Sequence, residues 1–200
     1  GAELAAGVGP QLEYVRAIRA ALPEDGFLVD ELTQVGYVSR VAFPAYRPRQ
    51  FISSGYQGTL GWGYATALGV KAAHPDRAVV AIAGDGGFLF TATELATAKR
   101  HGLGVVAVVF NDNAYGNVRR FQIENFRGRT IASDLASPDF VQLAASFGIG
   151  GERVDSAVTL EPALRRALAA GVPYVIEVAV GDFPSPWKFI QLPRVRGATP

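Results

Sequence analysis

The sequence contains no cysteine, and its only histidines are His74 and His101. The lack of cysteine excludes disulfide bonds, thiolate nucleophiles and thiolate metal sites. His74 precedes Pro75 and is predicted to lie in a helix-ending turn, whereas His101, before Gly102, is predicted to be a cation at a helix C-terminus. Neither is assigned a catalytic role, so any metal bound by this chain must be one that prefers oxygen ligands.

An excess of charge of one sign is also lacking. The chain has 19 Lys and Arg residues against 18 Asp and Glu residues, which provides no broad field for binding nucleic acid or an anionic membrane. Apolar runs such as 105–110 are far shorter than the roughly 20 residues that span a bilayer. The N-terminus has no basic segment followed by an apolar one. We therefore predict a soluble, cytoplasmic protein without nucleic-acid or membrane partners.

The composition provides enough hydrophobic residues for one core, because 49% of the 200 residues are hydrophobic, and we treat 1–200 as one domain. Short runs rich in Val and Ile alternate with helical patterns, which is typical of buried parallel strands with crossover helices. This alternation predicts an α/β domain in which a parallel sheet has helices on both faces. The predicted strands are 27–30, 78–83, 105–110 and 174–180, and the predicted helices are 11–22, 64–73, 91–100, 140–147 and 160–170.

Two segments fall outside this alternation. Residues 40–63 are rich in aromatic residues, proline and glycine, and the tail 181–200 contains Pro184, Pro186 and Pro193. Both segments are predicted to be irregular, and the tail is a candidate for docking on something outside this chain.

The candidate chemistry begins where the strand 78–83 runs into Gly84-Asp85-Gly86-Gly87. At the carboxyl end of a parallel strand the loop leaves the sheet, and the following helix presents unpaired amides to anions. Glycines there let the backbone approach a phosphate closely. A plain strand-to-helix turn with Asp85 as the helix cap explains the same residues equally well, so this motif alone leaves both interpretations open.

A second polar turn follows the next predicted strand, with the sequence Asn111-Asp112-Asn113-Ala114-Tyr115-Gly116. If the two strands are neighbours, Asp85 and Asp112 converge at one point of the sheet edge. Two carboxylates repel each other there unless a cation lies between them, and Mg²⁺ or Ca²⁺ suits them; Mg²⁺ also bridges to phosphates. The pair therefore favours a metal site over two unrelated polar turns.

The combination of Gly84-Asp85-Gly86 with Asn111-Asp112 resembles the signature of thiamine-diphosphate-dependent enzymes. Together with 57–61, 94–98, 115–116 and 138–140, it is similar to the C-terminal diphosphate-binding domain of acetolactate synthase and benzoylformate decarboxylase relatives. The resemblance implies thiamine diphosphate and Mg²⁺ as cofactors, and decarboxylation or carboligation of 2-oxo acids as the activity. The metal ligands that it implies are Asp85, Asp112 and the backbone carbonyl of Ala114. The cofactor-binding residues that it implies are Thr33, Gly58, Thr59, Leu60, Gly84, Asp85, Gly86, Gly87, Asp112, Ala114, Tyr115 and Gly116.

The resemblance also assigns two residues to the catalytic centre. Leu60 would be the bulky residue on which the cofactor folds, and Gly58 would offer its carbonyl to the cofactor's 4′-amino group. From the residues alone, Leu60 is a leucine that packs in a core or loop. The family usually has asparagine where this chain has Asp112, and the extra negative charge predicts a site that depends more strongly on its metal.

Other polar residues carry weaker predictions. Arg119 and Arg120 follow the second motif and either are solvated or form a charged fork for a substrate carboxylate. Glu94 is predicted to be structural, near the start of a helix. A nicotinamide fingerprint fails, because Leu89 occupies the third glycine position after Gly84 and Gly86.

The wider organisation follows from the resemblance alone. It implies that this chain is the C-terminal part of a longer enzyme and that a pyrimidine-binding domain, of the same or another chain, supplies an activating glutamate. A homo-oligomer, either a dimer or a tetramer, is expected. A β-type subunit with a separate partner and a noncatalytic regulatory or assembly module remain open alternatives, as do the substrate and the binding of FAD.

Overall fold

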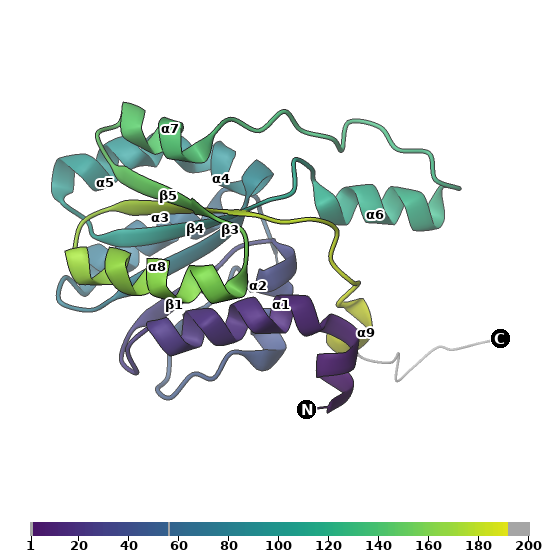
Figure 1. Cartoon of the computed structure of the whole chain (residues 1–200), viewed down its shortest axis with the longest axis horizontal. Coiled ribbons are helices and arrows are strands. Elements are labelled where there is room, and N and C mark those ends of the chain that lie inside the picture. The colour runs from purple at the N-terminus through teal and green to yellow at the C-terminus, as the bar shows by residue number, and fades with distance from the viewer. Residues whose placement is uncertain (1, 56, 192–200) are drawn as a thin grey trace.

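The strands form one parallel sheet at the centre of the molecule (Figure 1). The structure is a computed structural model that describes residues 2–55 and 57–191, and in this part of the chain the sheet has six strands in the order β2-β1-β3-β4-β6-β5. Every neighbouring pair is parallel, which confirms the predicted α/β class. The strands are β1 (Phe27–Asp30), β2 (Phe51–Ile52), β3 (Val79–Gly84), β4 (Val105–Asn111), β5 (Gly150–Val154) and β6 (Tyr174–Ala179).

Alternate side chains of the central strands point to opposite faces of the sheet, and each face packs on its own layer of helices. Val80 and Ile82 pack toward α1 (Ala2–Ala21), α2 (Gln34–Ala42) and α8 (Ala157–Ala170). Val79 and Ala81 pack toward the other layer, which contains α3 (Trp62–Ala73), α4 (Asp85–Thr91), α5 (Leu95–His101) and α7 (Phe140–Ser146). A single 3₁₀ turn, Ala92–Glu94, joins α4 to α5.

The order of the strands opens a crevice between β1 and β3. The chain winds from β1 outward to β2 and then returns to β3 on the other side of β1. As a result α2, which follows β1, covers one face of the sheet, and α4, which follows β3, covers the other. Loops that leave neighbouring strands toward opposite faces separate from each other, and ligands of open α/β sheets bind at such a point.

Several elements that the sequence did not predict lie where no long apolar run or amphipathic pattern marks them. The edge strand β5 is mostly solvent-accessible, and α6 (Gly116–Asn125) buries none of its residues and projects beyond both helix layers (Figure 1). The segment 40–63, predicted to be irregular, contains the end of α2, the two-residue strand β2 and the start of α3. The helix predicted at 11–22 begins earlier, at Ala2, with a kink at Val8 before Pro10.

The tail departs from its predicted irregularity through one short helix, α9 (Trp187–Ile190). The helix forms because Trp187 packs on Tyr37 of α2, with 4.9 Å between the ring centroids, and its indole donates a hydrogen bond to Asn117. The tail before α9 is anchored by Gln11, whose side chain donates to the carbonyl of Pro184. The tail thus docks on this chain as far as it is described, while its last part, 192–200, lies outside the described residues.

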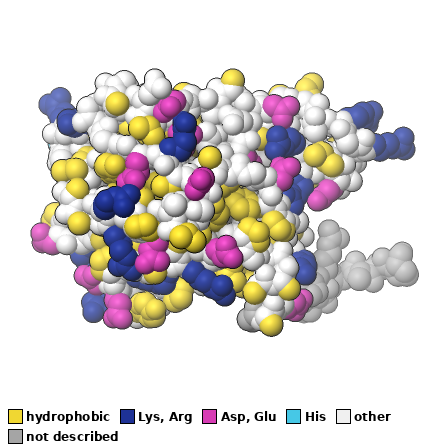
Figure 2. Space-filling model, viewed as in Figure 1, with side chains coloured by type: hydrophobic (Ala, Val, Ile, Leu, Met, Phe, Trp, Pro, Cys, Tyr) yellow, Lys and Arg dark blue, Asp and Glu magenta, His cyan; other side chains and the backbone are white. Residues whose placement is uncertain are grey.

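The surface carries charges of both signs without a large patch of either on the face shown in Figure 2. This agrees with the near balance of basic and acidic residues in the sequence. No helix in the described part of the chain has both the length and the apolarity that a membrane crossing requires.

An aromatic cluster joins α3, α4 and α7, and we expect a substitution in it to cause a large loss of stability. Phe140 is fully buried and packs on Phe88, which in turn packs on Tyr64. We expect Phe140→Ala to lower the free energy of unfolding by about 3–5 kcal/mol, because the cavity cannot be refilled by the neighbouring rings. Val158→Ala, at an exposed position, should change it by less than about 0.5 kcal/mol. Urea denaturation measures both, and equal effects would place Phe140 outside the core.

Candidate functional site

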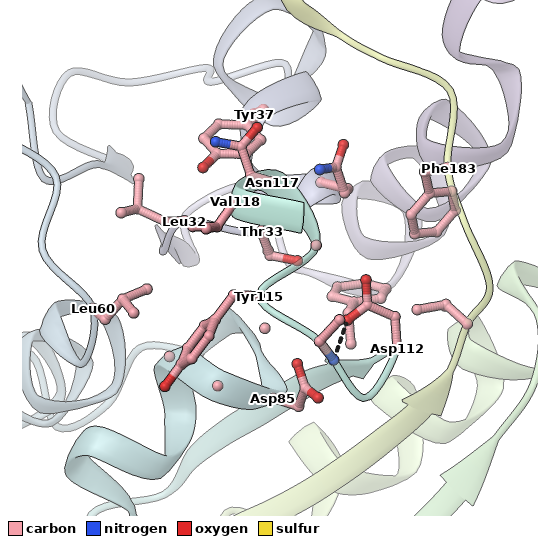
Figure 3. A pocket seen from close by; sticks show the side chains of 18 residues that line it. Leu32, Thr33, Tyr37, Leu60, Asp85, Asp112, Tyr115, Asn117, Val118 and Phe183 are labelled. Atoms are coloured by element: carbon pink, nitrogen blue, oxygen red, sulfur yellow. Dashed lines mark hydrogen bonds between the residues drawn. The ribbon is translucent and has the colours of Figure 1, made fainter. Parts of the chain in front are cut away.

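The crevice between β1 and β3 contains a pocket that gathers most of the site residues predicted from the sequence (Figure 3). Its floor is the glycine turn after β3, and its walls come from the loop after β1, the polar turn after β4 and the tail. The predicted residues that line it are Thr33, Leu60, Gly84, Asp85, Gly86, Gly87, Asp112, Ala114, Tyr115 and Gly116. The predicted residues Gly58 and Thr59 are not among its lining residues.

Asp85 and Asp112 meet because β3 and β4 are neighbours. In their parallel register Gly84 is opposite Phe110, and Asp85 and Asp112 follow these two residues by one and two positions. Burial raises the pKa of Asp85. Burial and, secondarily, the negative charge of Asp85 raise the pKa of Asp112 to about 6. The buried Asp85 and the half-buried Asp112 therefore form a mutually repelling pair of carboxylates, which is a place where a cation is stabilised.

The turn that carries Asp112 is held from three sides. Asn113 has a positive φ of 54°, a conformation that asparagine tolerates better than most residues, and the amide of Ala114 donates to Asp112 Oδ1 at 3.2 Å. The strand beneath is anchored by Asn111, whose side-chain amide donates to the buried Glu177 of β6 at 2.8 Å. Backbone hydrogen bonds to residues 133 and 135 close the far side.

The position of Asp85 depends on a residue that the sequence analysis did not identify. Ser137, in the segment before α7, donates its hydroxyl to Asp85 Oδ2 at 2.7 Å. This bond fixes one oxygen of the Asp85 carboxylate at the lining of the pocket. No motif signals Ser137, because it is 52 positions away in the chain.

The glycines of the two turns are required by close contacts. A Cβ on Gly86 would lie 2.5 Å from the ring of Tyr115, and a Cβ on Gly116 would lie 2.5 Å from Asp112 Oδ2. Any side chain at Gly116 would therefore displace the second carboxylate. The two turns are packed against each other as one unit, with the backbone exposed toward the pocket.

Leu60 lies on the opposite side of the pocket from the two aspartates, with Tyr115 between them in Figure 3. The chain turns sharply after it, since Gly61 has a φ of 84° and precedes α3. Gly58 is exposed and does not line the pocket, and a Cβ on it would lie 2.8 Å from the side chain of Leu32. Of the predicted residues in the segment 57–61, Leu60 lines the pocket, whereas Gly58 and Thr59 do not.

Further residues line the pocket that the sequence analysis missed. Gln34, at the start of α2, is buried, and its Oε1 has no hydrogen-bond partner among the described residues. A buried, unpaired polar atom in a pocket wall costs free energy unless a ligand or water satisfies it. The other residues that line the pocket and were not predicted are Leu32, Tyr37, Phe110, Asn117, Val118, Val180 and Phe183. Leu32 follows β1, Tyr37 belongs to α2, Phe110 to β4, and Asn117 and Val118 to α6, whereas Val180 and Phe183 follow β6.

The two arginines after the second motif bind protein groups. Arg119 forms ion pairs with Asp134 and Asp182, at 3.2 and 3.0 Å, and Arg120 donates to the carbonyl of Phe183. They therefore do not form a free fork for a substrate carboxylate, but they fasten the tail to α6.

The histidines and Glu94 lie outside the pocket lining. His74 ends α3, and His101 lies in the last turn of α5 before the left-handed Gly102, as predicted. Glu94 accepts a hydrogen bond from Thr97 at 2.6 Å, which agrees with a structural role.

Three known proteins are similar to this chain in sequence or in structure. The chain is 36% identical over 139 residues to a probable acetolactate synthase large subunit of Methanococcus aeolicus, covering 69% of this chain and 23% of that protein. It is 30% identical over 158 residues to a sulfoacetaldehyde acetyltransferase of Castellaniella defragrans, covering 79% and 26%. The structure of a thiamine diphosphate-dependent 4-hydroxybenzoylformate decarboxylase of Rhodococcus jostii RHA1 matches with a TM-score of 0.79 and 30% identity, covering 88% and 33%.

The chain thus spans between about a quarter and a third of the length of these relatives. A family model described as "Thiamine pyrophosphate enzyme, C-terminal TPP binding domain" matches residues 33–178. This range includes both aspartate turns, Leu60 and the sheet from β2 to β6. The chain therefore belongs to the family of C-terminal thiamine-diphosphate-binding domains.

Proposed function

We propose that the pocket binds thiamine diphosphate through Mg²⁺, and that the protein of which this domain is part decarboxylates or joins 2-oxo acids in the manner of acetolactate synthase. The observation that carries the proposal is the convergence of Asp85 and Asp112 in one pocket at the crevice between β1 and β3. The family assignment supports the cofactor, and the relatives' names support the class of reaction.

The side chains present fit a magnesium ion. Asp85 and Asp112 offer carboxylate oxygens, and the carbonyl of Ala114 is the proposed third ligand from the protein. Within residues 2–55 and 57–191, no group of three or more His, Cys, Asp or Glu side chains could hold a metal alone. The remaining ligands would therefore be water and phosphate oxygens, which is the coordination that Mg²⁺ characteristically keeps.

The backbone around Asp85 and Asp112 fits a diphosphate. Gly84, Gly86 and Gly87 bring the backbone after β3 into the lining of the pocket, and α6 begins at Gly116 with its N-terminus at the pocket. Unpaired amides at the start of a helix favour an anion. The hydroxyl of Thr33, in the loop after β1, can donate a further hydrogen bond to the diphosphate. The unpaired Oε1 of Gln34 is an acceptor and would take a donor group or water instead.

The organic part of the cofactor would lie between Leu60 and the two aspartates, Asp85 and Asp112. When bound, thiamine diphosphate supplies an electron sink for breaking or forming the bond next to a 2-oxo group. In the proposed role, Leu60 fixes the bend of the cofactor, while the carbonyl of Gly58, which lies outside the lining of this pocket, holds its amino group. The apolar side chains of Phe183 and Val180 exclude water from the opposite wall.

The remainder of the active site is proposed to come from a pyrimidine-binding domain in the same or another chain, which would supply the activating glutamate. Assembly as a dimer or tetramer is part of this proposal. A panel of 2-oxo acids given to the complete enzyme, with product identification, tests the reaction class. An enzyme that binds thiamine diphosphate but converts none of them would contradict it.

Asp112 is the metal ligand at which this chain differs from the usual pattern, and Asp112→Asn tests its role. Asparagine retains an oxygen and removes one repulsion, so thiamine diphosphate should bind equally well or better in saturating Mg²⁺, while affinity for Mg²⁺ without cofactor falls about tenfold. Asp112→Ala should lose both. Calorimetric titrations measure these affinities.

We also expect the wild type and Asp112→Asn to differ in how their affinity for Mg²⁺ depends on pH. Because the pKa of Asp112 is about 6 without metal, Mg²⁺ must displace its proton at lower pH, and the wild-type affinity for Mg²⁺ should fall as the pH drops below 6. Asp112→Asn has no such proton and should vary less. If asparagine is as damaging as alanine in cofactor titrations, Asp112 is not a ligand of the proposed kind.

A further inference from the structure

Glu31 is a buried carboxylate next to the pocket that the proposed chemistry does not use. It follows β1 directly and is 1% exposed, and the next two residues, Leu32 and Thr33, line the pocket. Burial raises the pKa of Glu31, and hydrogen bonds from two backbone amides partly offset this rise. A charged side chain is costly to bury unless it is well paired, so its contacts indicate what it is for.

Both carboxylate oxygens of Glu31 bind the turn that carries Leu60. Oε1 accepts a hydrogen bond from the amide of Gly61 at 2.7 Å, and Oε2 accepts one from the amide of Gly63 at 2.9 Å. No Lys, Arg or His among the described residues forms a salt bridge with it. Its partners are therefore the unpaired amides at the start of α3.

The same carboxylate is packed against the glycine turn after β3. A Cβ on Gly87 would lie 2.1 Å from Glu31 Oε1, and a Cβ on Gly63 would lie 2.9 Å from Oε2. Glu31 thus fills a space that both glycines leave open. One side chain joins the loop after β1, the turn before α3 and the start of α4.

These three segments carry different parts of the pocket: Thr33 on the first, Leu60 on the second and Gly86 with Gly87 on the third. Leu60 is covalently next to Gly61. Among the described residues, the other side-chain hydrogen bond to Gly61 comes from Thr91, whose hydroxyl donates to the Gly61 carbonyl at 3.0 Å. The distance between Leu60 and the pair formed by Asp85 and Asp112 therefore depends on where Glu31 holds the turn.

We propose that Glu31 is a positioning residue that holds Leu60 at a set distance from the Asp85 and Asp112 pair, and so adapts the pocket to the organic part of its ligand. The inference rests on the proposed function for the identity of that ligand. It assigns Glu31 no contact with the cofactor and no proton transfer. Its action is to fix the backbone of residues 60–63.

The test compares two ligands in the complete enzyme, thiamine diphosphate and inorganic diphosphate, each with Mg²⁺. Glu31→Gln keeps the shape, but its amide group is itself a donor and can accept from only one of the two backbone amides. Gly87→Ala reaches the same contact from the other side. Gln50→Ala is the matched control, because Gln50 is also buried, accepts from the amides of Tyr46 and Arg47, and does not line the pocket.

We expect both Glu31→Gln and Gly87→Ala to weaken thiamine diphosphate about tenfold, and Glu31→Gln to leave inorganic diphosphate within about twofold. Hydrogen exchange of the amides of Gly61 and Gly63 should accelerate about tenfold in Glu31→Gln. Gln50→Ala should lower thermal stability without changing either affinity.

Equal weakening of both ligands by Glu31→Gln, or unchanged affinity for thiamine diphosphate, would overturn the positioning role. A wild-type enzyme that binds no thiamine diphosphate would instead refute the proposed function, and the inference would fall with it. Exchange at Gly61 and Gly63 that does not change in Glu31→Gln would contradict the inference whatever the cofactor does.

Discussion

Replacing Asp85 by alanine is expected to abolish the binding of thiamine diphosphate that depends on Mg²⁺. Asp85 is 1% exposed, and its Oδ2 is held by Ser137 at 2.7 Å. The substitution removes one of two carboxylates and leaves Asp112 alone with a dication and an anionic cofactor. We expect affinity to fall at least about a hundredfold, or about 2.7 kcal/mol.

Magnesium and thiamine diphosphate should also cease to bind cooperatively in this variant. In the wild type each ligand completes the site of the other, because the metal links the carboxylates to the diphosphate. Without Asp85 this link is broken, and added Mg²⁺ should no longer increase cofactor affinity. Titration calorimetry at several Mg²⁺ concentrations measures this coupling.

Asp182→Ala is a suitable control for the Asp85 variant. Asp182 is an aspartate near the same pocket, but its side chain is exposed and pairs with Arg119. Its loss should change cofactor affinity by less than about threefold, since exposed ion pairs contribute about 0–1 kcal/mol. Undiminished cofactor affinity in Asp85→Ala would mean that the metal site lies elsewhere.

The second large effect is expected from the 200-residue chain by itself, which should release no carbon dioxide from pyruvate above background. The carboxylates that line its pocket, among the described residues, are Asp85 and Asp112, and both are proposed to be occupied by the metal. Glu31 is bound to the amides of Gly61 and Gly63. No acidic group is therefore left in this pocket to activate the cofactor.

Addition of the pyrimidine-binding partner, joined or separate, should restore turnover, because it is proposed to supply the missing glutamate. A coupled assay for carbon dioxide compares the isolated chain with the assembled protein, with thiamine diphosphate and Mg²⁺ saturating in both. The Asp85→Ala assembly is the control for cofactor-independent release. Clear turnover by the pure chain would require a base from within this sequence and would refute the proposed division of the site.

The sequence by itself determined the central strands and the point at which the two aspartates meet. Residues 78–83 and 105–110 are runs that are buried on both faces, so their hydrophobicity is continuous and recognisable. Each ends in a polar turn, and parallel strands place such turns at one edge. For this reason Asp85 and Asp112 could be paired from the sequence, and the structure brings them together.

The tertiary structure alone decided which other residues complete the pocket. Ser137 and Glu31 carry no motif, and their roles arise from contacts with residues that are distant in the chain. Gln34 carries no motif either, and only its buried, unpaired Oε1 in the pocket wall distinguishes it. Periodicity reports which residues face a core, but not which turn lies beside which. For the same reason the sequence could not show that Leu60 faces the pocket while Gly58 and Thr59 do not.

The projecting helix α6 and the docked tail show the physical reason most directly. Helix α6 buries none of its residues, so no apolar stripe marks it in the sequence. The described part of the tail is held by Gln11, Tyr37 and Asn117, which belong to three other helices. Local sequence determines elements that bury their own hydrophobic face, whereas elements held by polar and aromatic contacts across the chain are determined only when the whole fold has formed.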